Sequence, residues 1–380
     1  MAEPAYLDVF GHEDLKARLA RAAENRRLGQ SILLHGHRGV GKQRLALWIA
    51  ALINCPGPGS RPCGACRSCR LAGRLQHPDV HWFFPLPRPK GASGPDRLRK
   101  KLEDQRAAEL EERRANPLYL DDEEGATGIY VAAAQVMRQL AYKAPAMGPA
   151  KVLVIGRAEA LVPQAANPEA ANALLKLLEE PPADTWIVLT SDVPGALLPT
   201  IRSRVQAVRV PPMPTEQVAA FLSDRLDLAP AEAHRLARLS GGSIGVALEL
   251  QDADQDESRS FASDLVRALL DGRSAARLAA AHRFRSTGAR GNFARILGVT
   301  RGILRDLLAI STGAPASDPE AVGSLARGRP LDPETLVAAL DAIEDARELA
   351  DRNINPQLIV VNFLRRASVT TGVPAGRHAG

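Results

Sequence analysis

All four cysteines of the 380-residue chain lie close together in the sequence. They are Cys55, Cys63, Cys66 and Cys69, and their spacing includes two consecutive C-x-x-C steps. Each short step lets neighbouring thiolates turn onto one ion, and four such ligands are typical of tetrahedral structural zinc. In a cytosolic chain this clustering favours a metal over disulfides. We therefore expect one structural zinc ion, with reduced, unliganded thiols or an iron–sulfur cluster as the alternatives.

A second chemical signature is a glycine-rich turn, G-x-x-x-x-G-K, between an apolar run and a helical stretch. It includes Gly36, Gly39, Gly41 and Lys42, and this spacing predicts a phosphate-binding loop. Gln43 stands where a serine or threonine hydroxyl would hold magnesium. The loop is therefore either a weak phosphate site without magnesium or an inherited turn that only packs.

A buried parallel strand is predicted at Lys151–Ile155, because the run is continuously aliphatic rather than alternating. In P-loop ATPases a strand of this kind ends in acidic residues that hold the magnesium shell and polarise the attacking water. Here Gly156 and Arg157 occupy those places, and Glu159 lies too far along to be assumed a substitute. The sequence therefore indicates a nucleotide-binding fold that has lost its own chemistry.

Strands alternate with helices over residues 1–211, which predicts an open, largely parallel sheet covered on both faces. Residues 212–252 have the pattern of a small helical lid, and residues 258–369 that of a helical collar domain. We expect the acidic run Asp252–Glu257 to be a linker between them and residues 370–380 to form a disordered tail.

Residues 87–128 form an insertion that begins with prolines and continues into a segment dense in lysine, arginine and glutamate. Interleaved charges predict one solvated helix at about Arg97–Arg114, and a nucleic-acid-binding arm is the alternative. The formal net charge of +6 is compatible with nucleic acid nearby, but an aromatic content of 4% argues against base-stacking platforms. The first residues lack a secretory signal and no run is long enough to span a membrane, so a cytoplasmic location is expected.

Together these features resemble the clamp-loader branch of the AAA+ ATPases, and within it the bacterial delta-prime family. The match covers roughly residues 7–369, except the insertion. The segments that carry it are the phosphate loop, the four-cysteine insert, Val9-Phe10-Gly11-His12, His77-Pro78-Asp79, Asn172–Pro182, Ile201-Arg202-Ser203-Arg204 and Arg352-Asn353-Ile354-Asn355-Pro356.

The resemblance implies a subunit that does not hydrolyse ATP by itself, because motor subunits carry an arginine sensor at the position of Gly245. It also implies that Arg204, after Ser203, serves as an arginine finger for ATP held by a neighbouring subunit, as in the family's Ser-Arg-Cys motif. Val205 replaces the cysteine of that motif. An ordinary surface arginine is the alternative.

The partners implied are the gamma/tau ATPase subunits, the delta subunit, primer–template DNA within the complex and, weakly, the sliding clamp. The assembly would be part of the DNA polymerase III holoenzyme. Two other functions remain open at this point. One is an ATP-hydrolysing motor subunit, in which Glu159 or another acid activates water. The other is a zinc- and DNA-binding adaptor that uses the basic insertion.

Overall fold

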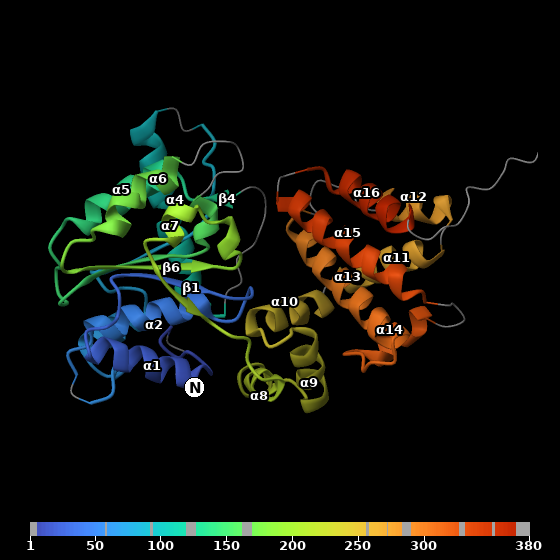
Figure 1. The fold of residues 1–380 in the computed structure, drawn as a ribbon, viewed down its shortest axis with the longest axis horizontal. Coiled ribbons are helices and arrows are strands. Elements are labelled where there is room, and N and C mark those ends of the chain that lie inside the picture. The colour runs from blue at the N-terminus through green and yellow to red at the C-terminus, as the bar shows by residue number, and fades with distance from the viewer. Residues whose placement is uncertain are drawn as a thin grey trace, which may run out of the picture. The chain divides into compact units, whose positions relative to one another are not determined.

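The computed structural model divides into two compact units, which are described separately (Figure 1). The N-terminal unit comprises Met1–Asp121, Thr127–Arg225 and Gly241–Gly245, and the C-terminal unit comprises Asp122–Ala126, Leu226–Ser240 and Val246–Gly380. The structure describes residues 6–57, 59–91, 94–118, 127–161, 169–255, 258–271, 273–282, 290–326, 331–351 and 354–369. In that part of the chain, no helix is long and apolar enough to cross a membrane.

The N-terminal unit contains a parallel five-stranded sheet, as the alternation of strands and helices predicts. Its spatial order is β2 (Val80–Phe83), β5 (Lys151–Ile155), β6 (Thr185–Ser191), β1 (Ser31–His35) and β7 (Gln206–Arg209). Its helices are α1 (Glu13–Glu24), α2 (Lys42–Asn54), α3 (Arg67–Gly73), α4 (Pro95–Ala115), α5 (Val131–Ala141), α6 (Glu169–Glu179), α7 (Pro199–Arg202) and most of α8 (Thr215–Leu226).

Alternate residues of the strands enter two different cores, because successive side chains in a strand point to opposite faces. Ile32 and Leu34 of β1 pack with α1 and α2, together with Val152 and Val154 of β5. Leu33 of the same β1 strand packs instead with α5 and α6. Figure 1 shows the sheet between α1 and α2 on one side and α5 and α6 on the other. The fold class predicted from the sequence is confirmed.

The insertion differs from its expected form. Its ends form a short antiparallel pair, β3 (Leu86–Pro87) with β4 (Thr127–Gly128), which the sequence did not indicate. Helix α4 is not simply a solvated helix, because Leu102 and Arg113 are only 3% and 5% exposed. The guanidinium of Arg113 lies 4.0 Å from the ring centroid of Phe84 and 4.5 Å from that of Trp82. The charge pattern misled because arginine covers aromatic faces while its charge pairs with Glu109.

Helices are the only regular secondary structure in the described part of the C-terminal unit. Its helices are α9 (Pro230–Leu239), α10 (Ile244–Gln255, from Val246 on), α11 (Ser258–Asp271), α12 (Ser274–His282), α13 (Arg290–Ser311), α14 (Pro319–Ala326), α15 (Pro333–Asp351) and α16 (Pro356–Val369). One apolar core unites α11 to α16, with Phe363 among its largest fully buried side chains.

In this unit the structure corrects one sequence prediction and adds one helix that was not expected. Helix α10 continues to Gln255, so most of the acidic run expected to be a linker is helical. Helix α14 was not predicted, because its eight residues offer too few turns for a periodic pattern. The predicted disordered tail, residues 370–380, lies outside the described residues.

Candidate functional site

The phosphate loop joins β1 to α2, as its spacing predicts. Gly39 and Gly41 have φ angles of 73° and 94°, which glycine adopts without a steric penalty. Gly36 lies so close to the carbonyl oxygen of Val210 that a side-chain carbon at position 36 would collide with it. The glycines are therefore required by the turn itself, whether or not the loop binds a phosphate.

Lys42 is the first residue of α2, and its side chain is 5% exposed. Its ammonium group contacts the Asp192 carboxylate at 2.5 Å and donates to the carbonyl oxygens of Gly36 and His37 at 2.9 and 2.6 Å. All of these partners belong to the N-terminal unit. The lysine expected to reach a phosphate is thus held within the protein.

Gln43 stands where a magnesium-binding hydroxyl was expected. Its Oε1 is buried without a hydrogen-bond partner in the described part of the chain, and so is the indole Nε1 of Trp82. A side-chain carbon added at Gly156 would lie 2.6 Å from that Oε1. The Gln43 amide therefore fills the space into which an acidic side chain at position 156 would extend.

Arg157 and Glu159 follow Gly156 closely, and each makes a contact at this strand end. Arg157 has a φ of 50°, and its backbone N–H donates to Thr190 Oγ1 at 3.0 Å. Glu159 Oε1 accepts a hydrogen bond from the backbone N–H of Asp192 at 3.2 Å. Burial raises the pKa of Glu159, and the neighbouring charge of Asp192 raises it further. Glu159 and Asp192 therefore lie close together at this strand end, and Glu159 Oε2 is buried without a hydrogen-bond partner among the residues described.

Gly245 packs directly on the phosphate loop. Its backbone N–H donates to the carbonyl of Gly39 at 2.9 Å, and a side-chain carbon at position 245 would lie 2.7 Å from the Gly39 Cα. The hydroxyl of Ser243 donates to the carbonyl of Arg38 at 2.8 Å. An arginine at position 245 would have no room here.

Arg204 follows the short helix α7 and is held at the surface of the N-terminal unit, with 30% of its side chain exposed. Its Nε lies 3.0 Å from Glu179 Oε2 at the end of α6, and its Nη1 donates to the carbonyl of Thr200 at 3.0 Å. The Ser203 hydroxyl lies 3.4 Å from the same Nη1 and donates to Thr200 at 3.2 Å. This arrangement orients a guanidinium while leaving part of it accessible.

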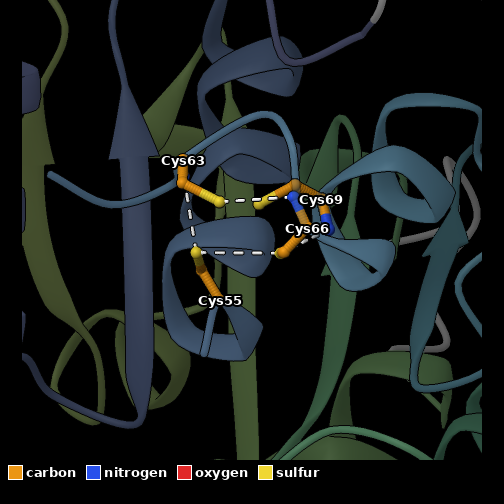
Figure 2. A group of neighbouring side chains, drawn as sticks. All are labelled: Cys55, Cys63, Cys66 and Cys69. Atoms are coloured by element: carbon orange, nitrogen blue, oxygen red, sulfur yellow. Dashed lines mark hydrogen bonds between the residues drawn. The ribbon is translucent and has the colours of Figure 1, made fainter. Parts of the chain in front are cut away.

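The four cysteine side chains converge between the end of α2 and the start of α3 (Figure 2). All four sulfur atoms lie within 4.8 Å of one another. Tetrahedral zinc with Zn–S bonds of about 2.3 Å separates its sulfurs by about 3.8 Å. The ligand set and its spacing therefore fit structural zinc. Gly57 is required here because a side chain at that position would collide with Cys63 Sγ.

Backbone N–H groups support the sulfurs, as in a metal knuckle. Those of Cys63, Cys66 and Cys69 donate to Cys55 Sγ, Cys63 Sγ and Cys66 Sγ at 3.4, 3.4 and 3.3 Å. The N–H groups of Cys66 and Ala65 lower the pKa of Cys63 to about 6, whereas burial raises the pKa of Cys69.

The sequence predictions missed two carboxylates, Asp192 and Glu179. Asp192 directly follows β6, whose register places Ser191 opposite His35 of β1. Charged residues just after neighbouring parallel strands meet at one edge of the sheet, so the position of Asp192 was a usable signal. Glu179 lies within the segment Asn172–Pro182, whose pattern as a whole suggests a family but assigns no role to this residue.

Comparison with known proteins identifies the family. The model of the family described as "DNA polymerase III, delta subunit" matches residues 11–214, more than half of the chain. DNA polymerase III subunit delta' of Pseudomonas aeruginosa is 32% identical over 240 residues, which cover 63% of this chain and 60% of the relative. The corresponding Escherichia coli protein is 28% identical over 60% of this chain and 56% of its own length.

A relative with another subunit name and a solved structure are also similar. DNA polymerase III subunit tau of Salmonella typhimurium is 29% identical over 65% of this chain and 32% of its own length. The structure of a Thermotoga maritima gamma-subunit-related protein covers 93% of this chain and 98% of its own, with 17% identity and a TM-score of 0.42. The matches span 60% or less of the length of these curated relatives. By its family match, the chain belongs to the DNA polymerase III delta subunit family.

Proposed function

We propose that this chain is a subunit of the bacterial replicative clamp loader, in the role that the delta' relatives are named for. It does not hydrolyse ATP, and it lends Arg204 to ATP held by a neighbouring subunit. The observation that carries the proposal is a contrast within one unit. Lys42 of the chain's own phosphate loop is paired with Asp192 inside the protein, whereas Arg204 is oriented by Glu179 and partly accessible.

The chemistry proposed for Arg204 is charge neutralisation in trans. Negative charge on the transferring phosphoryl group is stabilised by a guanidinium, and such a finger accelerates transfer by about 10³–10⁵. Ser203 and Glu179 act as positioning residues, because they hold the guanidinium at a defined angle. The partners of this proposal are the gamma/tau ATPase subunits, the delta subunit, the sliding clamp as a weak contact, and primer–template DNA inside the assembly.

ATP turnover tests the proposal with the isolated chain and with a reconstituted loader. The isolated chain is expected to be silent, and Arg204→Ala is expected to slow the ATP site it serves by about 10³–10⁵. Arg202→Ala is the matched control, since Arg202 is exposed two residues earlier. Turnover by the isolated chain would establish the motor-subunit alternative, and unchanged turnover with Arg204→Ala would leave a scaffold role only.

Zinc binding by the four cysteines is part of the same proposal. The ion would be held by Cys55, Cys63, Cys66 and Cys69 and would fix the turn between α2 and α3, a structural role. Metal analysis of the purified chain is expected to give about one zinc per chain. Cys66→Ser is expected to release it and to lower the melting temperature; a metal content well below one in the wild type would contradict the site.

The adaptor alternative depends on the basic residues of α4, and the packing of α4 weighs against it. Arg113 stacks on Phe84 and Trp82, and Arg106 lies 4.7 Å from the ring centroid of Phe83 while pairing with Glu103. These charges are engaged within the N-terminal unit. Salt-sensitive binding of DNA by the isolated chain would restore that alternative.

A further inference from the structure

The ammonium group of Lys42 has all of its hydrogen-bonding capacity engaged inside the protein. A lysine carries three N–H donors, and Lys42 contacts three oxygens: Asp192 Oδ1 at 2.5 Å and the carbonyls of Gly36 and His37. The side chain of Lys42 is 5% exposed and that of Asp192 21%. A buried ammonium needs such a counter-ion, and here a carboxylate of the same chain supplies it.

The main chain and Glu159 fix the position of Asp192. Asp192 continues β6, which pairs with β1 up to the contact between Ser191 and His35, and Gly36 N–H donates to Ser191 O at 3.3 Å. The backbone N–H of Asp192 is held in turn by Glu159. The register of the sheet therefore places the backbone of Asp192 beside the phosphate loop, and its carboxylate contacts Lys42 from there.

The loop is also fixed along the segment before Lys42. Three consecutive carbonyl groups accept hydrogen bonds from other elements of the N-terminal unit: Arg38 from Ser243 Oγ, Gly39 from Gly245 N–H, and Val40 from His12 Nε2 at 2.8 Å. Such a network restrains the loop in one conformation, in which Lys42 contacts the carboxylate of Asp192.

We propose that Asp192 occupies the place of a phosphate group, so that its carboxylate determines that this loop takes no nucleotide. An oxygen of the aspartate stands in for the phosphate oxygen that Lys42 would otherwise bind. An incoming di- or triphosphate must displace a negative charge that is tethered to the loop. The inference deepens the proposed non-hydrolysing role and rests on it, and it assigns nucleotide exclusion to one residue.

The test is ATP binding by the full-length chain, measured by calorimetry in EDTA so that magnesium and turnover play no part. Asp192→Asn keeps the shape of the side chain and removes its charge. It is expected to tighten ATP binding by about 10²-fold or more, because it removes a like charge from the loop. Asp184→Asn is the matched control, since Asp184 precedes the same strand β6 at its opposite end.

Thermal unfolding gives a second measurement on the same variants. Asp192→Asn leaves the buried ammonium of Lys42 without its counter-ion, so its melting temperature is expected to fall, and pyrophosphate is expected to restore it. The added substitution Lys42→Met should abolish the gained ATP affinity. Asp192→Ser serves the same purpose if the asparagine variant does not fold.

The proposal is overturned if the wild type binds ATP as tightly as Asp192→Asn, or if the affinity gained persists after Lys42→Met. Failure here is separate from failure of the proposed function. The finger is tested by turnover of the assembled loader with Arg204→Ala, a measurement that does not depend on the affinity of this loop.

Discussion

A side chain at position 156 would collide with the amide oxygen of Gln43. The residue types at these two positions are therefore best interpreted together. The absence of an acid at position 156 and of a hydroxyl at position 43 are linked, because the Gln43 amide fills the space that a side chain at position 156 needs. A similar steric restriction holds at Gly245, where a side chain would collide with the backbone of Gly39 in the phosphate loop. At positions 156 and 245, the space that a side chain would need is therefore already filled by a neighbouring group.

Reintroducing an acid should therefore destabilise the protein. We expect Gly156→Asp to lower the free energy of unfolding by about 1–3 kcal/mol, the usual cost of overpacking a filled site. Adding Gln43→Ser should recover part of this loss, because the two positions are in contact and their effects couple. Urea denaturation measures both variants.

Gly195→Asp is the control for that experiment, since a side chain at Gly195 would meet no atom within 4 Å. Its effect is expected to stay within about 0.5 kcal/mol. Strict additivity of Gly156→Asp and Gln43→Ser would show that the two residues do not share the space described.

At the scale of elements, the segment His77-Pro78-Asp79 links the cysteine insert to the sheet. Ser68 of α3 lies 2.9 Å from His77 Nε2, and Asp79 N–H donates to His77 Nδ1 at 3.1 Å. The buried Asp79 carboxylate accepts the backbone N–H groups of Ala146, Met147 and Gly148 at 2.5, 2.8 and 2.8 Å. One short segment thus fixes the loop between α5 and β5.

The Asp79 carboxylate should make the stability of the protein depend on pH. Burial alone would raise the pKa of Asp79, but the three N–H donors and His77 together lower it. A carboxyl whose pKa is lowered by folding stabilises the native state at pH values above the ordinary aspartate pKa of about 3.9. This contribution is lost as the pH falls below that value. Asp79→Asn should therefore reduce stability at pH 7, and the difference from wild type should shrink under acid conditions.

Urea denaturation at several pH values measures this difference. Asp332→Asn is a useful comparison, because hydrogen bonds from Thr335 lower the pKa of that exposed carboxyl without burying it. Its effect is expected to be smaller at every pH. A constant difference between wild type and Asp79→Asn down to strongly acid pH would contradict the role given to the ionised carboxylate.

Most elements were predictable because their signals are local. The aliphatic runs of β1, β5 and β6 and the proline that begins α16 mark elements without any tertiary information. Helix α4 was harder to interpret, since nothing in a charged sequence says that Arg113 covers two aromatic rings brought from β2 and its following residue. The phosphate-loop glycines were found by motif, whereas the Lys42–Asp192 pair required the order of strands in the sheet.

At the scale of the whole molecule, the division into two units passes through the segment predicted as a lid. Helix α8 belongs to the N-terminal unit up to Arg225, and α9 belongs to the C-terminal unit. Within the C-terminal unit, Asp318 contacts Arg235 of α9 at 3.2 Å and also pairs with Arg259 of α11. This buried carboxylate ties α9 to the collar helices, while the three-domain division stays a prediction.

Removing that carboxylate should weaken the C-terminal unit. We expect Asp318→Asn to cost about 1–3 kcal/mol, because two arginines lose a buried charged partner. Scanning calorimetry should show a shift in the transition of this unit. Asp271→Asn is the control: its partner Arg273 has 78% of its side chain exposed, and such surface pairs contribute about 0–1 kcal/mol. Equal shifts for both variants would contradict the role of Asp318.

The contact between Gln43 and Gly156 also bears on how this branch of the family could change. A substitution that restored an acid at position 156 would arrive in a space that Gln43 still fills, and one that restored a hydroxyl at position 43 would find no acid beside it. Under the proposed function, neither single step would recover catalysis, and the first would reduce stability. Under the proposed function, a change of this chain into an ATP-hydrolysing subunit would therefore pass through less stable or inactive single variants. A loader that contains this chain would depend on the neighbouring subunits for ATP hydrolysis.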